Sequence, residues 1–517
     1  MANPAHPSTA PRFQRQRERA GKLPLSVKVF QGLGALPEAL KGFAFNTFLL
    51  LFYNQVLGLS ASMAGAALLV GVAVDAVTDP LVGTWSDGLK SRLGRRHPLM
   101  YASVLPLLVT LWALFSPPQT LDAAGLGIWL LVFAVAARVS MTLFQVPWSA
   151  LFVELSDDYV ERSELVAFRW AFGILGVAVF TVLSWGVVFQ SSEAFPEGQL
   201  DPGNYGLFAG MLAVSVAGAA LLSTLLTQRD VPFLLQPEEG VGFSFARASG
   251  DLRAALRLPN FRRLFVGLLF TATLTGTVEA LRIYLSTYFW ELTPEDLQWY
   301  AVAALGAFAA IAAVPALNRR FDKRLILVVA MGVSILDAII LVSLRFAGIL
   351  PENGEPLLLP ILVANEVFRA FLVVLVGTMF VSMIADTVDE QELATGRRQE
   401  GVFSAAVSFS NKAISGLGIL FAGLLLDHVI ELTPDTSPGE VAADNLVRLG
   451  AVMGYLVPAL YVLPLFVLLG YSLSRERHSA IRAALDARHG TERVSLPSAA
   501  PADLPPPSAV SPLPETP

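Results

Sequence analysis

The 517-residue sequence contains no cysteine and few charged residues. Asp, Glu, Lys and Arg make up 15% of the chain, whereas a soluble protein carries about 25%. The lack of cysteine excludes disulfides, thiolate metal sites and cysteine nucleophiles. The sequence also lacks H-E-x-x-H, G-x-S-x-G and G-x-x-x-x-G-K-[ST], and its five histidines are scattered without metal-site spacing. We therefore expect no enzymatic activity, no ATP coupling, no cofactor and no nucleic-acid partner.

Hydrophobic residues make up 54% of the chain, and they gather in long runs. About twelve runs are long enough to cross roughly 30 Å of hydrocarbon. They lie near 32–57, 62–87, 98–116, 125–154, 164–190, 204–227, 261–290, 298–317, 324–346, 357–386, 401–428 and 447–474. We therefore expect an all-α polytopic membrane protein embedded in a lipid bilayer.

Polar segments divide this chain into five parts. The first residues are polar and Arg-rich instead of apolar, which is not the pattern of a signal peptide, and a second polar stretch separates the two groups of spans. The tail begins helix-like and ends in a Pro-rich sequence that favours disorder. The expected parts are a disordered N-terminus (1–28), a six-helix bundle (29–228), a connector (229–260), a second six-helix bundle (261–474) and a disordered tail (475–517).

The loops between the spans alternate in charge. One set is basic: the N-terminus, residues 90–96, 229–263, 319–324 and 397–398, and the chain after 475. The other set is acidic: residues 193–201, 291–296, 352–355 and 431–444. Because Lys and Arg are retained on the cytoplasmic side, we expect both termini in the cytoplasm and an inner-membrane location in a bacterium.

A weak internal repeat suggests two related bundles. DPLVGTWSDGLKSRLGRR after the second span matches VPALNRRFDKRL after the eighth in outline, and VELSDDYVERSEL matches IADTVDEQELATGRRQE. Such a repeat predicts two pseudo-symmetric six-helix bundles with a central site between them. Val314 stands where the first half has Asp79, so any cation site is expected in the first half.

Asp75 and Asp79 lie within the second apolar run, four residues apart and therefore on one face of a helix. A carboxylate in the middle of a membrane helix costs about 2.5–3.5 kcal/mol, and two adjacent like charges cost more. One interpretation is that a sodium ion or a proton binds between them. The other is that neighbouring Arg or Lys side chains, or a water-filled vestibule, compensate the pair.

The segment GLSASMAGAALLVGVAVDAVTDPLVGTWSDGLKSRLGRRHP resembles the second span and following loop of the glycoside–pentoside–hexuronide:cation symporters. This is the melibiose-permease branch of the major facilitator superfamily. IADTVD at 384–389 and Lys412 resemble the tenth and eleventh spans of the same family, and the similarity extends from about Gln31 to Ser474. The resemblance implies the twelve-helix major facilitator fold and cation-coupled transport by alternating access.

The resemblance also implies two sets of site residues. The cation site, for sodium or a proton, falls on Asp75 and Asp79, which would be the metal ligands if the ion is Na⁺, with Thr78 and Thr142 as further oxygens. The implied substrate site contains the following residues: Gln145, Trp148, Arg169, Lys412 and Glu38.

Two positions depart from the family pattern. Where the family has sugar-binding aspartates, this sequence has Ala39, next to Glu38, and Gln145. Such changes usually alter the substrate. The same fold and aspartate pair also occur in animal sodium-dependent lysophosphatidylcholine carriers, so a lysolipid or other amphiphile is the alternative substrate.

Charged residues near the cytoplasmic ends suggest a gate. Possible pairs are Asp87 with Arg95 and Arg96, Glu154 with Arg162, and Asp386 and Asp389 with Arg397 and Arg398. Pairs that join the two halves would set the balance between inward-open and outward-open states. The alternative is that these charges reflect membrane topology alone.

Four further charged residues form pairs at i, i+3 inside apolar spans: Glu279 with Arg282, and Glu366 with Arg369. Such pairs lower their own burial cost. They either serve this structural role or contact substrate in the cavity. Arg138 on the fourth span is expected toward the outer mouth of that cavity.

The favoured hypothesis is a monomeric, cation-coupled symporter for a sugar-like or glycoside-like small solute. The second hypothesis is a cation-dependent carrier of lysophospholipid or another amphiphile, which predicts a cavity that opens laterally to the membrane. The third is a membrane sensor or scaffold that does not transport. It predicts no gradient-driven uptake and no effect of neutralising Asp75.

Overall fold

The computed structural model describes residues 13–14, 22–156, 158–234, 236–237, 253, 255–396, 407–410, 412, 414–434, 436 and 438–495. Apart from a two-residue strand pairing of β1 (Phe13–Gln14) with β2 (Gln236–Pro237), the regular structure of these residues is helical. The first half contains α1 (Leu25–Leu33), α2 (Leu36–Ala44), η1 (Phe45–Leu49), η2 (Phe52–Val56), α3 (Ala61–Gly88), α4 (His97–Leu114), α5 (Ala123–Leu155), α6 (Tyr159–Leu183), η3 (Ser184–Val188), η4 (Gly198–Leu200), α7 (Asn204–Thr227) and η5 (Gln228–Phe233).

The second half begins at α9 and ends in a helix that follows the last apolar span. Its elements are α9 (Pro259–Tyr284), η6 (Leu285–Phe289), α10 (Pro294–Leu297), η7 (Gln298–Val302), α11 (Ala303–Arg320), α12 (Lys323–Phe346), α13 (Leu358–Thr395), η8 (Ile414–Gly418), α15 (Ile419–Leu425), η9 (Leu426–Ile430), η10 (Pro438–Glu440), α16 (Ala443–Ala451), η11 (Val452–Leu456), α17 (Val457–Leu460), α18 (Val462–Leu469) and α19 (Arg475–Ser495).

Eleven helices among the described residues are long and apolar enough to cross a membrane. A shorter apolar helix, Gly416–Ile430, lies where the eleventh of the twelve expected spans was placed. Residues 407–410 and 412 before it are also helical. The expected polytopic α-helical fold is confirmed.

Some boundaries differ from the expected ones. Helix α1 begins at Leu25, inside the segment that was expected to be disordered. Helix α13 continues past 386 to Thr395 and ends at Gly396, whose φ of 70° suits glycine. The polar residues at these ends carry no apolar signal, so a search for membrane-length runs does not detect them.

Side-chain caps fix where several spans begin. Asp122 accepts a hydrogen bond from the backbone N–H of Gly125 at 2.8 Å, Asp158 accepts from that of Val160 at 2.8 Å, and Asp322 accepts from that of Arg324 at 2.9 Å. Each carboxylate satisfies an N–H group that lacks a partner inside the helix and lies at the positive end of the helix dipole.

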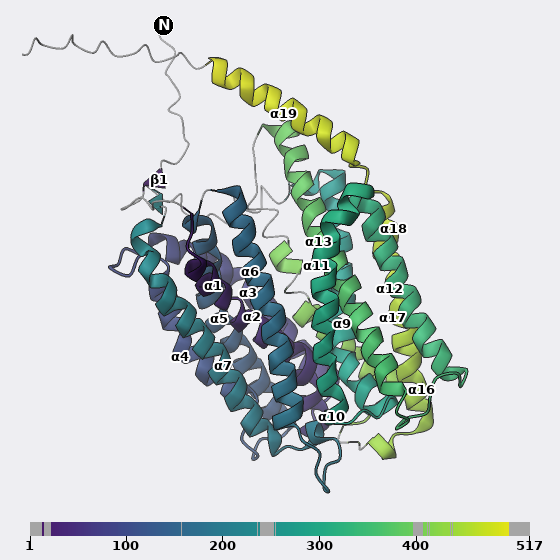
Figure 1. The fold of residues 1–517 in the computed structure, drawn as a ribbon. Coiled ribbons are helices and arrows are strands. Elements are labelled where there is room, and N and C mark those ends of the chain that lie inside the picture. Colours follow the sequence, from purple (N-terminus) through teal and green to yellow (C-terminus); the bar gives the residue numbers. More distant parts are fainter. Residues whose placement is uncertain are drawn as a thin grey trace, which may run out of the picture.

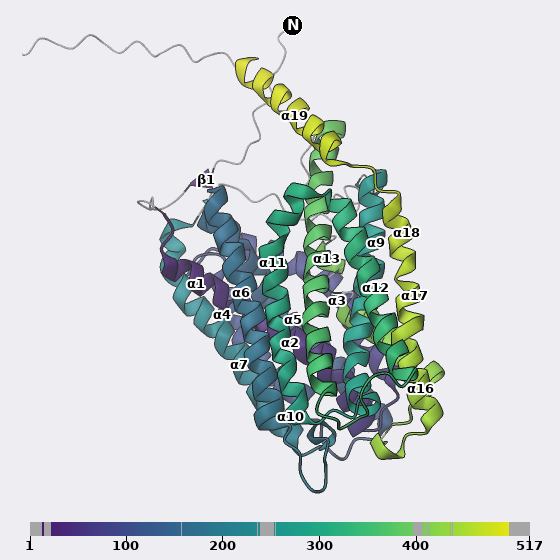
Figure 2. The same ribbon diagram turned by 45° about the vertical axis from the view of Figure 1, so that its right-hand side comes forward.

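The helices form two groups that lie side by side, and Figures 1 and 2 show the first half in purple and blue and the second in green and yellow. Helices α4, α5 and α7 pack together in the first group, and α11, α12 and α13 pack together in the second. Helix α3 packs against α15, which joins the groups. We call the two groups the first and second bundle.

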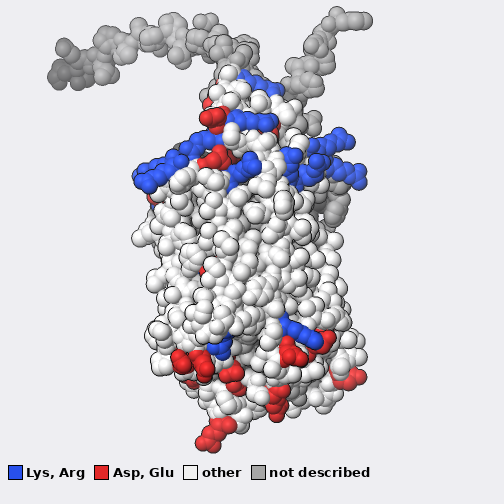
Figure 3. Space-filling view, turned by 90° about the vertical axis from the view of Figure 1, so that its right-hand side faces the viewer, with Lys and Arg blue, Asp and Glu red and all other residues white. Residues whose placement is uncertain are grey.

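Charge separates along the long axis of the molecule. Figure 3 shows Lys and Arg predominating at one end, Asp and Glu predominating at the other, and a belt with almost no charged residues between them. We call these the basic end and the acidic end. Helices α3, α5, α11 and α13 run from the acidic to the basic end, whereas α9 and α12 run the opposite way. The belt matches a protein surrounded by lipid.

Candidate functional site

Two parallel helices place the aspartate pair against partners on the fourth span. Arg138 on α5 donates to Asp75 Oδ2 at 2.8 Å, and Thr142 on α5 donates to Asp79 Oδ1 at 3.0 Å. In the sequence, each of these two residues follows its aspartate by 63 positions. Because parallel helices keep their register, the four-residue spacing of the acids is matched by the four-residue spacing of Arg138 and Thr142.

Arg138 neutralises Asp75 deep inside the first bundle. The side chains of Arg138 and Asp75 are 2% and 3% exposed. Room for Arg138 comes from Gly71, one turn before Asp75, because a Cβ at Gly71 would lie 2.6 Å from Arg138 Cδ. Arg138 was expected near the outer mouth of the cavity. Its position beside Asp75 corrects that expectation, and the matched spacing on the two spans is the sequence signal that was missed.

Lys412 reaches the same site from the second bundle. Its Nζ lies 2.7 Å from Asp79 Oδ2 and 3.4 Å from Asp75 Oδ2. The Asp79 and Lys412 side chains are 28% and 25% exposed, so this side of the site is open. Two acids and two bases therefore leave the site without net charge.

Glycines allow the second bundle to approach α3 closely. A Cβ at Gly416 would lie 2.2 Å from Val72 Cγ2, and a Cβ at Gly65 would lie 2.6 Å from Leu420 Cα. Small residues permit such approach between membrane helices. The position of Lys412 beside the aspartates therefore depends on the contact between α3 and the η8–α15 segment.

Two buried oxygens at the site have no hydrogen-bond partner among the described residues. They are Asp75 Oδ1 and Thr78 Oγ1. Together with the Asp79 carboxylate and Thr142 Oγ1, they form a set of oxygen atoms of the kind that hard cations bind. No group of three or more His, Asp or Glu side chains in the described part of the chain is arranged to hold a metal ion. A cation here would therefore bind two carboxylates and hydroxyls.

Trp148 is held by the first helix instead of facing open space. Its indole N–H donates to the Gln31 carbonyl at 3.1 Å, and Gln31 Nε2 donates back to the Trp148 carbonyl at 3.1 Å. Gly34 makes this contact possible, because a Cβ there would lie 1.9 Å from Trp148 Nε1. The Arg169 guanidinium lies 3.9 Å from the Trp148 ring centroid. A substrate could stack on that ring face only after Arg169 moves.

The other residues of the implied substrate site are separate from this stack. Gln145 Oε1 is buried and has no partner among the described residues, so it is available to accept a hydrogen bond. Glu38 pairs with Lys41 one turn along α2, at 2.8 Å, and its side chain is 42% exposed. The structure brings Trp148 and Arg169 together, and Lys412 belongs with the aspartates.

The basic-end charges of the first bundle pair within that bundle. Glu154 Oε1 lies 2.6 Å from Arg95 and 2.9 Å from Arg96, and Asp87 lies 2.6 Å from Arg96. Arg162 donates to the Ser156 carbonyl at 2.8 Å. Glu154 thus pairs with Arg95 and Arg96 instead of with Arg162, the expected partner.

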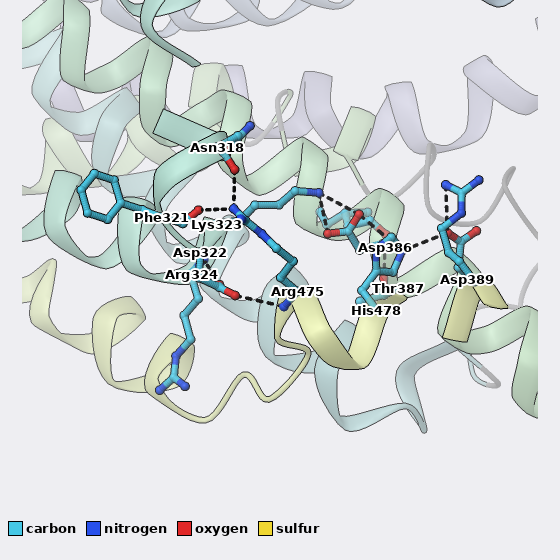
Figure 4. A network of polar contacts seen from close by, with 12 residues as sticks. Asn318, Phe321, Asp322, Lys323, Arg324, Asp386, Thr387, Asp389, Arg475 and His478 are labelled. Atoms are coloured by element: carbon cyan, nitrogen blue, oxygen red, sulfur yellow. Dashed lines mark hydrogen bonds and ion pairs between the residues drawn. The ribbon is translucent and has the colours of Figure 1, made fainter. Parts of the chain in front are cut away.

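The corresponding charges of the second bundle pair with their own bundle and with α19, as Figure 4 shows. Asp386 lies 2.7 Å from Lys323, and His478 on α19 lies 3.0 Å from Asp389. Arg475 donates to the Phe321 carbonyl at 2.6 Å. Arg397, the expected partner, lies outside the described residues. In this structure these acids attach α19 to the second bundle.

Hydrogen bonds between the bundles gather at the acidic end. Tyr288 donates to Gln55 Oε1 at 3.1 Å, Gln199 donates to Thr287 Oγ1 at 3.0 Å, and Asp427 accepts from the Ser62 N–H at 2.8 Å. Asp427 thereby caps the first turn of α3 from the other bundle. These contacts join the two bundles at the acidic end.

The four charged residues predicted as two pairs form one ring in the second bundle. Within each helix, Arg282 lies 3.0 Å from Glu279, and Arg369 lies 2.9 Å from Glu366. Between α9 and α13, Arg282 lies 2.9 Å from Glu366, and Arg369 lies 2.6 Å from Glu279. We call these residues the second-bundle quartet. Each base meets both acids, so the quartet is neutral and closed.

Known proteins resemble this chain along nearly its whole length. The family model described as MFS/sugar transport protein matches residues 30–475. A putative glycoside/cation symporter, YagG, of Escherichia coli is 24% identical over 93% of this chain and 98% of its own. Sodium-dependent lysophosphatidylcholine symporter 1 of mouse is 25% identical over 92% of this chain and 91% of its own. A crystal structure of the nucleoside transporter NupG matches with a TM-score of 0.53 at 12% identity, over 87% of this chain and 99% of that chain.

Proposed function

The chain belongs to the family of MFS/sugar transport proteins, a family of membrane transporters and not enzymes, and from this premise we propose that it is a cation-coupled symporter of a sugar-like or glycoside-like solute. Asp75 and Asp79 bind the coupling cation, with Thr78 and Thr142 as supporting oxygens. The solute binds near Gln145, Trp148 and Arg169. Transport proceeds by rocking of the two bundles around this central site.

The observation that supports this proposal most strongly is the position of Lys412. Its ammonium lies within ion-pair distance of both carboxylates and comes from the opposite bundle. A positive charge between two acids is the arrangement that a bound cation would also produce. Lys412 therefore takes the place of the coupling cation when none is bound.

Exchange of Lys412 for a cation links ion binding to movement. When Na⁺ or a proton binds, Lys412 leaves Asp79, and the site keeps the same total charge. Arg138 stays with Asp75, because both side chains are buried within one bundle. Only the contact that crosses between the bundles changes, so cation binding shifts the balance between conformations.

The contacts between the bundles at the acidic end indicate which state of the transport cycle the molecule occupies. By the positive-inside rule the basic end faces the cytoplasm, so both termini lie there. Hydrogen bonds between the bundles at the acidic end then close the outer side. We propose that this arrangement is an inward-facing state in which Lys412 holds the cation position.

Arg169 favours a substrate that carries an acidic group. Its guanidinium stacks on Trp148 and Phe152, and it forms no ion pair with any other described residue. A carboxylate or phosphate would supply the missing counter-ion and form strong charge-assisted hydrogen bonds. Gln145 can accept a hydrogen bond from a sugar hydroxyl. An acidic glycoside fits both groups.

The test is uptake into proteoliposomes that contain the purified protein. A panel of neutral and acidic glycosides is offered under an imposed sodium gradient or an imposed pH gradient. We expect one gradient to drive uptake of an acidic glycoside, with loss of uptake in Asp79→Asn. Arg169→Gln should weaken uptake of acidic glycosides more than that of neutral ones. No gradient-driven uptake of any solute, and no effect of Asp79→Asn, would favour a sensor or scaffold.

A carrier of amphiphiles is the second candidate. Two observations support it: the identity to the mouse lysophosphatidylcholine symporter is comparable to that with the glycoside symporter, and Arg169 suits a phosphate as well as a carboxylate. Lysophospholipid uptake under the same gradients, without glycoside uptake, would select this candidate.

A further inference from the structure

The second bundle contains a cavity of about 260 Å³ that the proposed transport mechanism does not use. Its walls come from α9, η6, η7, α12, α13, η8, η11 and α17, all within the second bundle, and Asp75, Asp79 and Lys412 are not among the lining residues. Most of the lining is apolar and includes Met331, Leu341, Leu372, Val376 and Phe380. The cavity is thus distinct from the aspartate site on α3.

The fold does not require a cavity at this position. In the first bundle, the helices that correspond in chain order enclose packed aromatic rings. Phe52 lies 4.1 Å from Tyr205, Phe48 lies 4.8 Å from Phe208, and Phe115 lies 5.1 Å from Phe208, measured between ring centroids. Protein interiors are normally packed this densely, and empty apolar space costs stability. An unfilled apolar space of this size therefore suggests an occupant.

The carboxyl group of Asp337 at the cavity wall has no basic partner among the described residues. Asp337 on α12 accepts a hydrogen bond from Asn365 Nδ2 at 2.8 Å, and it makes no ion pair among the described residues. The nearby bases, Arg282 and Arg369, are already shared between the acids of the second-bundle quartet. Since the quartet is neutral, an ionised Asp337 has no base among the described residues to balance its charge.

We propose that this cavity binds an amphiphile with a cationic head group, whose ammonium pairs with Asp337 and whose apolar chain fills the space between α9, α12 and α13. A buried carboxylate inside a membrane protein is costly unless it is paired, and an ammonium supplies the pair. The mostly apolar lining accommodates a hydrocarbon chain, as is common in ligand cavities. This site goes beyond the proposed transport function and does not depend on it.

The experiment measures equilibrium binding of decyltrimethylammonium to the purified full-length protein in phospholipid nanodiscs. Decanol and decyl sulfate, which have the same chain length and neutral or anionic heads, serve as competitors. We expect saturable binding that excess decyltrimethylammonium displaces and decyl sulfate does not. Loss of the charge in Asp337→Asn should weaken binding about tenfold or more, because a desolvated charge pair is removed.

Three variants locate the site. Ser334 lines the cavity one turn before Asp337 and already donates to the Ala330 carbonyl, so Ser334→Ala should bind as the wild type does. Ala338→Phe, which fills the cavity, should abolish binding. Asp79→Asn should leave binding intact, which separates this proposal from the transport proposal.

Three outcomes would overturn the proposal. They are equal binding of all three head groups, unchanged binding in Asp337→Asn, and partition into the lipid without saturation. Neutral Asp337 would produce the first outcome, because a protonated carboxyl group does not distinguish a cation from an alcohol.

Discussion

Two groups of charged side chains, each with two acids and two bases, lie inside the membrane region, yet they are built differently. In the second-bundle quartet, Glu279, Arg282, Glu366 and Arg369 lie on two helices of one bundle and each base meets both acids. At the aspartate site, one base belongs to the same bundle and the other, Lys412, comes from the opposite bundle. Both groups are neutral, so charge balance does not distinguish them.

The two groups differ in the movement that would be needed to break their ion pairs. Opening the quartet would leave an ion unpaired inside one rigid bundle, which is expensive. Removing Lys412 from Asp79 requires only that the bundles shift and that a cation arrive. The site also retains two buried oxygens without hydrogen-bond partners among the described residues, Asp75 Oδ1 and Thr78 Oγ1. We therefore propose that the quartet has a structural role and that the aspartate site switches.

The largest expected effect is that of Asp75→Asn. It leaves Arg138 buried without its carboxylate, and breaking a buried ion pair costs about 3–5 kcal/mol. We expect a marked fall in the thermal unfolding temperature in detergent and loss of cation binding. The double variant Asp75→Asn/Arg138→Met should recover most of the stability and none of the cation binding. Wild-type stability in the single variant would contradict the pairing.

Arg369→Met is the matched change in the quartet. It leaves two acids to share Arg282, and we expect a destabilisation of about 3 kcal/mol, because removing one partner leaves a buried charge unpaired. Cation binding should stay within about twofold of wild type. If titration instead shows that cation binding is lost, the quartet takes part in coupling and the comparison fails.

Lys412→Met removes the competing ammonium while keeping a side chain of similar length. We expect cation affinity to rise about tenfold, because the ion no longer has to displace Lys412 and the site gains a negative charge. Solute uptake should fall, because the empty carrier loses the charge that neutralises the aspartates during its return. Weaker cation binding in this variant would show that Lys412 helps to hold the ion.

The smallest expected effect is that of Thr142→Val. The change keeps the side-chain shape and removes the 3.0 Å hydrogen bond to Asp79. Loss of one such bond is worth about 1 kcal/mol, so cation affinity should fall about fivefold. Thr110→Val on α4, whose hydroxyl donates to the Pro106 carbonyl, is a control that should leave cation binding unchanged.

The sequence best predicted the features that depend on the spacing of apolar and charged residues within a single helix. Apolar runs placed the described spans, although α1 begins before and α13 ends well after the expected bounds, and i, i+3 spacing placed Glu279 beside Arg282 and Glu366 beside Arg369. The resemblance to a symporter family placed Thr142 in the cation site and Lys412 in the substrate site, and the structure brings both side chains to the aspartate pair.

Contacts that depend on how helices approach were not predictable. Trp148 was expected to stack on a substrate, but Gly34 lets α1 approach so closely that Gln31 holds the indole. The joining of two local pairs into one quartet depends on the rotation of α9 relative to α13. The cavity beside Asp337 is likewise a property of packing and leaves no pattern in the sequence.

The most direct test of the account is cation binding to purified wild-type, Asp79→Asn and Glu366→Gln proteins, by radiolabelled sodium titration at several pH values with parallel measurement of proton release. The account predicts saturable binding of sodium or of a proton in the wild type and in Glu366→Gln, and loss of that binding in Asp79→Asn. Equal binding by Asp79→Asn and the wild type would contradict it. The aspartate site would then have the same structural role as the quartet.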